Sequence, residues 1–286
     1  MKILVLGASG MLGHAVMRVF AQDARYQVFG SVRSARAKKH FDLDLGARLI
    51  AGIDVENVDS LVALIDKVRP DAVINCVGLV KQFAEANDPL SALPINALFP
   101  HRLARLCGLA GARLVHISTD CVFSGRRGGY TEMHEPDALD LYGRSKLLGE
   151  VDYPHAVTLR TSIIGEELDS AHGLVGWFLA QKADVRGFTR AIFSGLPTCE
   201  LAAVIRDYVI PRSELHGLYH VASDPISKYD LLRLVNEEYG KGLRIEPDDT
   251  LEIDRSLDAD RFHATTGYSA PAWPQLVARM RCFHSN

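Results

Sequence analysis

Cysteine is scarce in this chain and shows no motif spacing. The 286 residues contain five cysteines, at positions 76, 107, 121, 199 and 282, and no two of them form a CxxC pair. This odd, dispersed set fits neither a disulfide framework nor a cysteine-based zinc site, so we expect a reducing compartment and a cytoplasmic protein. The eleven histidines also lack spacing such as HExxH, and we expect no metal site.

A strong charge imbalance and long apolar runs are missing as well. The net charge is −3, which gives no footprint for nucleic-acid binding. No apolar run reaches the length of about 18 residues that a membrane span needs. The opening stretch MKILVLGASG turns to glycines too early for a signal peptide. We therefore expect neither a nucleic-acid partner nor a membrane partner.

Short apolar runs alternate with amphipathic stretches along most of the chain, which predicts βαβ units. Strands are expected over residues 2–7, 26–32, 71–78, 112–119, 155–162 and 217–222. Helices are expected over residues 11–23, 58–69, 88–111 (interrupted by prolines), from about 141, and over 173–182 and 227–240. The predicted fold class is α/β, a doubly wound parallel sheet of the Rossmann type.

The pattern loosens after Gly165, and this indicates a second, smaller part. We expect residues 1–165 to form a dinucleotide-binding Rossmann domain. Residues 166–286 are expected to form mainly a mixed α/β substrate-binding lobe, with some segments returning to the Rossmann domain. Trp177, in GLVGWFL, is expected in the core of that lobe.

The stretch GASGMLG lies between the first expected strand and helix, and its spacing is GxxGxxG. Gly7 permits a tight turn, Gly10 lets a pyrophosphate approach the backbone, and Gly13 lets the helix pack against the strand. The helix N-terminus then offers N–H groups to phosphates. We expect this loop to bind a dinucleotide through the residues Gly7, Ser9, Gly10, Met11, Leu12 and Gly13.

The end of the second strand predicts which dinucleotide is bound. NAD binders place a carboxylate there for the ribose 2′-hydroxyl, but this stretch reads FGSVRSARAKK. Ser31 and Arg33 offer hydrogen bonds to a 2′-phosphate instead, and a guanidinium can do so with two parallel contacts. NADPH is therefore the preferred cofactor, while NADH remains an alternative in which the basic residues form a solvated loop.

The stretch DLYGRSKLLGE places Tyr142 and Lys146 four residues apart, on one face of a helix. A phenol has a pKa of about 10 and must lose about three units to exchange protons near neutrality. A nearby ammonium acts in that direction and can also hold ribose hydroxyls. Tyr142 is thus the candidate proton donor, Lys146 tunes it, and a surface pair of no function is the alternative.

The strand at 112–119 ends in HISTDCVFSG, at the sheet edge where ligands bind in open α/β folds. Thr119 is the candidate hydroxyl for a substrate carbonyl, with Ser118 in support. Both could instead satisfy backbone groups in a turn. Asp120 is a candidate for substrate contact.

With GASGMLG, STDCVFSG and YGRSK in this order, the chain resembles the extended short-chain dehydrogenase/reductases, and among them the dTDP-4-dehydrorhamnose reductase (RmlD-like) family. The resemblance implies the catalytic set Thr119, Tyr142 and Lys146. It further implies that the cofactor is lined by Asp54 and Val55 at the adenine and by Cys76, Val77 and Gly78 at the ribose and nicotinamide.

Several residues depart from the family pattern at positions that shape the substrate pocket. Cys121 stands where an aromatic residue is usual, Ile163 where a tryptophan is usual, and Ile192 and Phe193 replace an aspartate–glutamine pair. Three basic residues are further candidates for substrate binding. They are Lys81, after the fourth strand of the family fold, and Arg255 and Arg261 in IDRSLDADRF, which could clamp a diphosphate or form a solvated helix face.

These observations predict an NADPH-dependent reductase of a nucleotide-linked keto-sugar. One alternative is an epimerase or dehydratase that keeps NAD tightly bound, although Asp120 supplies only half of the acid/base pair that a dehydratase uses. Another is a non-catalytic regulatory subunit with the same fold, like that of methionine adenosyltransferase. A homodimer is compatible with the sequence.

Overall fold

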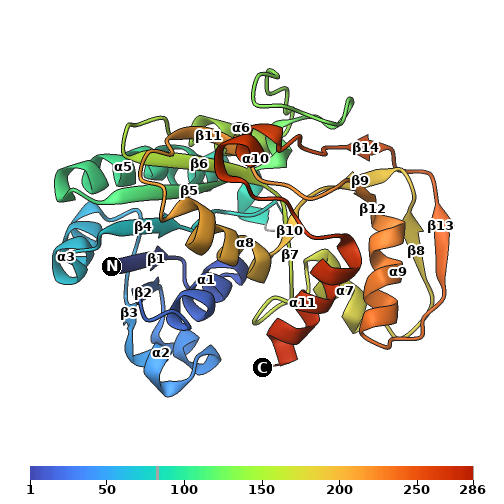
Figure 1. Ribbon diagram of the computed structural model, residues 1–286, viewed down its shortest axis with the longest axis horizontal. Coiled ribbons are helices and arrows are strands. Elements are labelled where there is room, and N and C mark those ends of the chain that lie inside the picture. The colour runs from blue at the N-terminus through green and yellow to red at the C-terminus, as the bar shows by residue number, and fades with distance from the viewer. Residues whose placement is uncertain (82–83, 286) are drawn as a thin grey trace. The chain divides into compact units, whose positions relative to one another are not determined.

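The computed structural model describes residues 1–81 and 84–285. Its main feature is a seven-stranded sheet in the order β11-β6-β5-β4-β1-β2-β3. Figure 1 shows the strands in this order, from β11 and β6 at the top of the view to β3 below. The strands are β1 Lys2–Leu6, β2 Gln27–Val32, β3 Leu49–Ala51, β4 Ala72–Asn75, β5 Arg113–Thr119, β6 Ala156–Thr161 and β11 Gly217–His220. This confirms the predicted doubly wound parallel sheet.

Strand β1 lies inside the sheet, between β4 and β2, and its apolar run KILVL is buried from its second residue onward. It pairs in parallel with β2, with Leu6 opposite Ser31, and in parallel with β4, with Leu6 opposite Asn75. The carboxyl ends of these strands therefore lie together, and the loops that follow them share one edge of the sheet.

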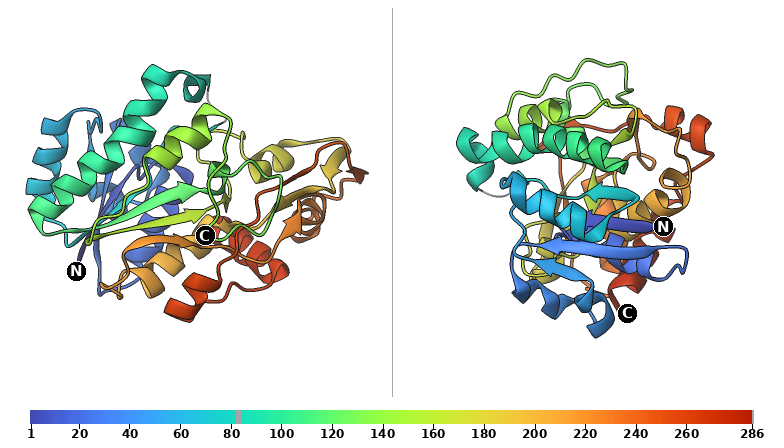
Figure 2. Two further views of the ribbon diagram at one scale, coloured as in Figure 1. Left: turned by 90° about the horizontal axis from the view of Figure 1, so that it is seen from above. Right: turned by 90° about the vertical axis from the view of Figure 1, so that its left-hand side faces the viewer.

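Helices cover both faces of the sheet. Those in the first part of the chain are α1 Met11–Ala21, η1 Ala35–His40, α2 Leu43–Ala47, α3 Val58–Val68, η2 Ala84–Asn87, α4 Pro89–Ala92, η3 Leu93–Leu98, α5 Phe99–Ala110, η4 Asp120–Val122 and α6 Leu141–Leu148. Helices α3 and α5 share one buried cluster with β1 and β4, which includes Leu61, Leu64, Phe99 and Leu103. In the view from above (Figure 2, left), the teal α5 lies on one side of these strands and the gold segment that contains η5 lies on the other.

Helix α3 shows how local sequence sets these elements. Its buried residues Leu61, Leu64, Ile65 and Val68 follow helical spacing. The side chain of Asn57 caps its first turn by accepting a hydrogen bond from the Ser60 N–H at 3.2 Å. The next residue after the helix, Arg69, has a left-handed backbone with φ of 49°, and Pro70 follows it.

The expected helix over 88–111 is divided as its prolines predicted. It begins as α4 with Pro89 in its first turn, continues as the π-helical turn η3 with Pro94 in its first turn, and continues again as α5 with Pro100 in its first turn. Each proline lacks an N–H group, so it is tolerated where a new helical segment begins. The widened turn η3 carries Asn96, which matters below.

The described residues form two compact units, each made of three segments. Unit 1 comprises residues 1–118, 139–159 and 202–218, and unit 2 comprises residues 119–138, 160–201 and 219–286, of which 286 is not described. The assignment of cofactor and substrate binding to separate parts of the chain stays a prediction.

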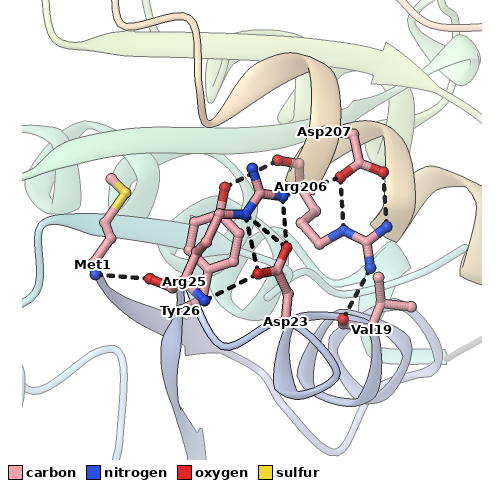
Figure 3. Close-up of polar contacts among 7 residues, drawn as sticks. All are labelled: Met1, Val19, Asp23, Arg25, Tyr26, Arg206 and Asp207. Carbon is pink, nitrogen blue, oxygen red and sulfur yellow. Dashed lines mark hydrogen bonds and ion pairs between the residues drawn. The ribbon is translucent and has the colours of Figure 1, made fainter.

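Within unit 1, segment 202–218 is tied to helix α1 by polar contacts (Figure 3). Arg206, in the π-helical turn η5 Ile205–Val209, donates a hydrogen bond to the Val19 carbonyl at 3.2 Å. In return, the Tyr26 hydroxyl donates to the Arg206 carbonyl at 3.3 Å. A segment that is distant in sequence is thereby fixed on the α1 face of the sheet.

Unit 2 contains small sheets, in the strand orders β10-β7, β12-β9-β14 and β13-β8. The strands are β7 Ile163–Ile164, β8 Val185–Phe188, β9 Ala191–Phe193, β10 Leu196–Pro197, β12 Ile226–Ser227, β13 Ile245–Asp248 and β14 Ile253–Asp254. The helices of unit 2 are α7 Leu174–Ala180, α9 Lys228–Glu238, α10 Asp260–Thr266 and α11 Trp273–Ser285, and α8 Thr198–Val204 passes from unit 2 into unit 1 at residue 202. The expectation that Trp177 lies in the core is wrong, because its helix α7 leaves it 38% exposed while Val175 and Phe178 are buried.

Candidate active site

The glycine loop joins β1 to α1 in the way that the sequence predicted. Gly7 has φ of +78°, a conformation that favours glycine. A Cβ atom on Gly13 would collide with the carbonyl oxygen of Gly7, so the helix sits directly against the loop. Gly10 is the N-cap of α1 and provides no side-chain cap, while Ser9 and Gly10 are exposed. An exposed, uncapped helix start is a site where backbone N–H groups can receive phosphates.

The burial of neighbouring residues and one backbone hydrogen bond help to hold the glycine loop in this conformation. Met11 is half-buried, and Leu12 is buried in the first turn of α1. The Gly10 N–H donates to the Gly7 carbonyl at 3.0 Å, which closes the turn. The binding role of these residues stays a prediction, but the close packing that glycine permits at Gly7 and Gly13 fits a dinucleotide loop.

At the end of β2, Ser31 and Arg33 have different surroundings. Ser31 is buried, and its hydroxyl accepts a hydrogen bond from the Gly7 N–H at 3.4 Å, so it helps to shape the glycine loop. Arg33 is exposed and directly follows β2. The basic turn η1 comes next, with Ser34 as its N-cap. The Arg33 guanidinium is thus free to contact a ligand from the solvent side, whereas the Ser31 hydroxyl contacts the glycine loop.

The residues after β3 and β4 line the same edge of the sheet. Asp54 is exposed and accepts a hydrogen bond from the Glu56 N–H at 3.0 Å. Val55 and Val77 pack against the buried cluster under β1 and β4. Burial raises the pKa of the Cys76 thiol to about 12 despite the opposing effect of the Lys146 ammonium, so Cys76 is a neutral wall residue.

Lys146 is the best-defined polar group at this edge. Only 5% of it is exposed, and its ammonium donates a hydrogen bond to the Ile117 carbonyl in β5 at 2.8 Å. Burial lowers the pKa of Lys146 to about 8, against the opposing effects of Glu150 and Cys76. A Cβ atom on Gly78 would lie 3.8 Å from this ammonium. The Lys146 ammonium therefore lies close to the loop that follows β4.

Helix α6 carries both Tyr142 and Lys146. Its N-cap is Asp140, whose carboxylate accepts from the Gly143 N–H at 2.8 Å and from the Lys81 ammonium at 2.6 Å. Lys81, a predicted substrate residue, is thus paired with this cap. Tyr142 is half-buried in the first turn of the helix.

Asn96 is a residue that sequence reasoning missed. It is 1% exposed, and its side chain makes three hydrogen bonds, two with the backbone of Leu79 and one with the Ser145 hydroxyl. It joins the loop after β4 to α6 within one turn of Lys146. Gly149 lets the end of α6 pack directly on the Asn96 carbonyl, because a Cβ there would overlap that oxygen. The signal that could have revealed Asn96 was its polar side chain inside the largely apolar stretch 88–111.

The end of β5 presents Ser118 and then Thr119. The Ser118 hydroxyl donates to the Glu150 carboxylate at 2.7 Å, within unit 1. In unit 2, the Thr119 hydroxyl donates to Asp120 at 3.1 Å and accepts from the Cys121 N–H at 3.1 Å. Burial raises the pKa of Asp120. These contacts order both hydroxyls, and the part that either plays toward a substrate stays a prediction.

The predicted diphosphate residues have their own neighbours within unit 2. Arg255 donates from Nε to the Phe123 carbonyl at 2.7 Å. Arg261 is exposed, and its guanidinium lies 4.7 Å from the ring centre of Tyr219. Ile163, Ile192 and Phe193, which are predicted to shape the substrate pocket, lie in the short strands β7 and β9.

In the described ranges 1–81 and 84–285, no group of three or more histidine, cysteine, aspartate or glutamate residues could hold a metal ion. No helix in these same ranges is long and apolar enough to cross a membrane.

Comparison with known proteins decides the family. The model of the RmlD substrate binding domain matches residues 1–280. The chain belongs to the RmlD family. This confirms the resemblance inferred from the motifs, and with it the assignment as an oxidoreductase.

One relative covers the whole chain. It is the probable low-salt glycan biosynthesis reductase Agl14 of Haloferax volcanii, 33% identical over 316 residues, which span 100% of this chain and 99% of the relative. Methionine adenosyltransferase 2 subunit beta of Rattus norvegicus is 30% identical over 149 residues, which span 52% of this chain and 41% of that protein.

A solved structure shows the same fold. The dTDP-4-dehydrorhamnose reductase of Bacillus anthracis, crystallised in complex with NADP, has a TM-score of 0.79 and 21% identity to this chain, with 99% of this chain and 98% of that chain covered. At this identity the likeness concerns the fold alone.

Proposed function

We propose that this RmlD-family protein is an NADPH-dependent reductase of a keto-sugar linked to a nucleoside diphosphate. The observation that carries the proposal is the buried Lys146 ammonium, held by the Ile117 carbonyl beside Gly78, with Tyr142 one helical turn before it. Family membership and the likeness to a glycan biosynthesis reductase support the reaction class.

The glycine loop and Arg33 would hold the cofactor. Backbone N–H groups at the start of α1 would receive its pyrophosphate, and the exposed Arg33 guanidinium would pair with a 2′-phosphate. Asp54 and Val55 would lie at the adenine, and Cys76, Val77 and Gly78 would lie at the ribose and nicotinamide. When bound, NADPH supplies a hydride, which the protein itself cannot provide.

The remaining chemistry belongs to side chains of this protein. Tyr142 would donate a proton to the carbonyl oxygen as the carbonyl carbon is reduced, so that the ketone becomes an alcohol. Lys146 would lower the pKa of this phenol by its charge and would hold ribose hydroxyls. Thr119, at the end of β5, would orient the carbonyl by a hydrogen bond, and the basic residues Arg255 and Arg261 would pair with the diphosphate.

Activity with NADPH and a panel of nucleotide-linked 4-keto sugars tests this proposal. We expect loss of NADPH absorbance with at least one sugar. Tyr142→Phe should lower turnover by about 10²- to 10⁴-fold, the usual contribution of a positioned acid, while NADPH still binds. Tyr229→Phe, on α9, is the matched control and should keep its activity. Full activity in Tyr142→Phe would remove the proton-donor assignment.

The likeness to methionine adenosyltransferase 2 subunit beta favours a second candidate, a regulatory subunit that keeps the cofactor fold. The two candidates differ in one measurable respect. A regulatory subunit would bind NADPH but would oxidise it with none of the keto-sugars, whereas the reductase turns over. NAD retained through purification would instead favour the epimerase or dehydratase alternative.

A further inference from the structure

Glu150 has no assigned role, yet it lies four residues beyond Lys146 and follows Gly149, the C-cap of α6. Its carboxylate accepts a hydrogen bond of 2.7 Å from the Ser118 hydroxyl. Ser118 is 5% exposed and immediately follows Ile117, whose carbonyl holds the Lys146 ammonium at 2.8 Å. Two adjacent residues of β5 therefore hold the two charged groups: Ile117 binds the Lys146 ammonium, and Ser118 binds the Glu150 carboxylate.

We propose that Glu150 is a positioning residue for Lys146. Its carboxylate, which Ser118 orients, supplies a negative charge that helps to keep the buried Lys146 ammonium in place. The proposal rests on the proposed function, in which the positive charge of Lys146 lowers the pKa of Tyr142. It concerns a residue that acts through another one and does not itself touch the substrate.

Electrostatics explains why such a group is needed. An ammonium that is 5% exposed has lost most of its hydration. Burial by itself favours the neutral amine, and Glu150 is the largest influence in the opposite direction on the pKa of Lys146. The cofactor would add a positive charge to this region when its nicotinamide is oxidised, so a fixed carboxylate would become more important during turnover.

The other groups that face Lys146 do not replace this carboxylate. Cys76 follows β4, and its raised pKa leaves it a neutral thiol. His116, in β5, is buried, with Nδ1 3.1 Å from the Asn75 amide nitrogen. Burial holds the pKa of His116 well below its ordinary value, with smaller effects of Lys146 and His101 in the same direction. His116 is therefore neutral near pH 7, and among the residues that the structure describes, Glu150 is the carboxylate that favours the Lys146 ammonium.

The pH profile of turnover gives the first test. Glu150→Gln keeps an oxygen that can accept the Ser118 hydrogen bond but removes the charge. We expect the alkaline limb of kcat to move to lower pH by about one unit, because a negative charge that favours the ammonium is lost. Ser118→Ala should move it in the same direction by less, because the carboxylate keeps its charge but loses its orientation. Glu237→Gln, an exposed glutamate of α9, is the matched control and should leave the limb in place.

A second readout does not depend on turnover. In the otherwise native protein, Glu150→Gln should lower the midpoint of thermal unfolding at pH 7 by about 3 °C, the change that a one-unit pKa shift gives in a protein of this size. In a Lys146→Met background the same substitution should change the midpoint by less than about 1 °C, since the charge on which Glu150 acts is gone.

These measurements separate the possible failures. An equal loss of stability from Glu150→Gln in both backgrounds, or an unmoved alkaline limb, would overturn the positioning role. Failure of every keto-sugar to react would instead remove the proposed function, and the thermal cycle would still decide whether Glu150 acts through Lys146.

Discussion

A Cβ atom on Gly13 would overlap the carbonyl oxygen of Gly7, so α1 meets the end of β1 at a distance that only glycine allows. Gly13→Ala should therefore destabilise the protein by about 1–3 kcal/mol, the range for overpacking at a rigid contact. Urea unfolding measures this change in the free energy of unfolding.

The matched control is Gly46→Ala in α2, where a Cβ would lie 3.9 Å from the nearest atom, the Lys38 carbonyl oxygen. Alanine favours a helix over glycine by about 1 kcal/mol, so this variant should be neutral or slightly stabilised. Equal stability of the two variants would show that the loop can relax around Gly13.

Arg33→Ala should weaken NADPH binding by about tenfold or more, because a hydrogen bond to a charged group contributes about 1.5–3 kcal/mol. NADH has no 2′-phosphate, and its dissociation constant should change by less than about threefold. Titration of both cofactors, followed by nicotinamide fluorescence, gives the two constants. Arg36→Ala, in the neighbouring turn η1, is the control, and equal losses for NADPH and NADH in Arg33→Ala would contradict the 2′-phosphate assignment.

Asn96→Ala should lower both stability and activity, because it leaves the partly buried N–H and C=O groups of Leu79 without their side-chain partner. Each unpaired buried polar group costs about 1–3 kcal/mol. Urea unfolding and turnover are the measurements. Asn87→Ala, at an exposed position in η2, should stay within about 0.5 kcal/mol of the native protein. Native-like behaviour of Asn96→Ala would mean that water replaces the amide.

Lys146 should make stability depend on pH in a defined window. Its pKa is about 8 in the folded protein and 10.5 as a free side chain. Below about pH 8 the folded state carries the full cost of the buried charge, about 3 kcal/mol. Between pH 8 and 10.5 the unfolded chain binds more protons than the folded one, so this contribution to stability rises with pH.

Lys146→Met lacks this titration. The free energy of unfolding of the native protein, minus that of Lys146→Met, should rise from pH 8 to 10.5 in urea titrations. The unpaired Ile117 carbonyl in the variant adds an offset that does not change with pH. A flat difference over this window would show that Lys146 keeps an ordinary pKa.

Sequence alone predicted the parts of the site that depend on neighbours in the chain. The glycine spacing from Gly7 to Gly13 and the helical pair Tyr142 and Lys146 are local patterns, and so are the apolar runs that became β1 and β4. The three-residue strand β3 was missed, because so short a segment shows no periodicity. Helix α11 was missed although its buried residues Trp273, Leu276, Val277 and Met280 have helical spacing.

The supporting groups could not be predicted, because their contacts join positions that are distant in sequence. Asn96 meets Ser145 across 49 residues, and Ser118 meets Glu150 across 32. Nothing in the residues around Asn96 or Glu150 records these partners. Only the fold, which brings η3, β5 and the end of α6 together, gives these side chains their partners.

Because unit 1 is divided into three segments, a fragment from the first part of the chain does not contain the whole sheet. The guanidinium of Arg113, at the start of β5, donates to the carbonyls of Val209 and Leu215 at 2.6 and 2.8 Å. A nascent chain that has emerged only as far as residue 165 lacks these acceptors, along with β11 at the sheet edge. A gene fragment that ends at residue 165, the boundary that the sequence indicated, would therefore encode an incomplete sheet that lacks β11.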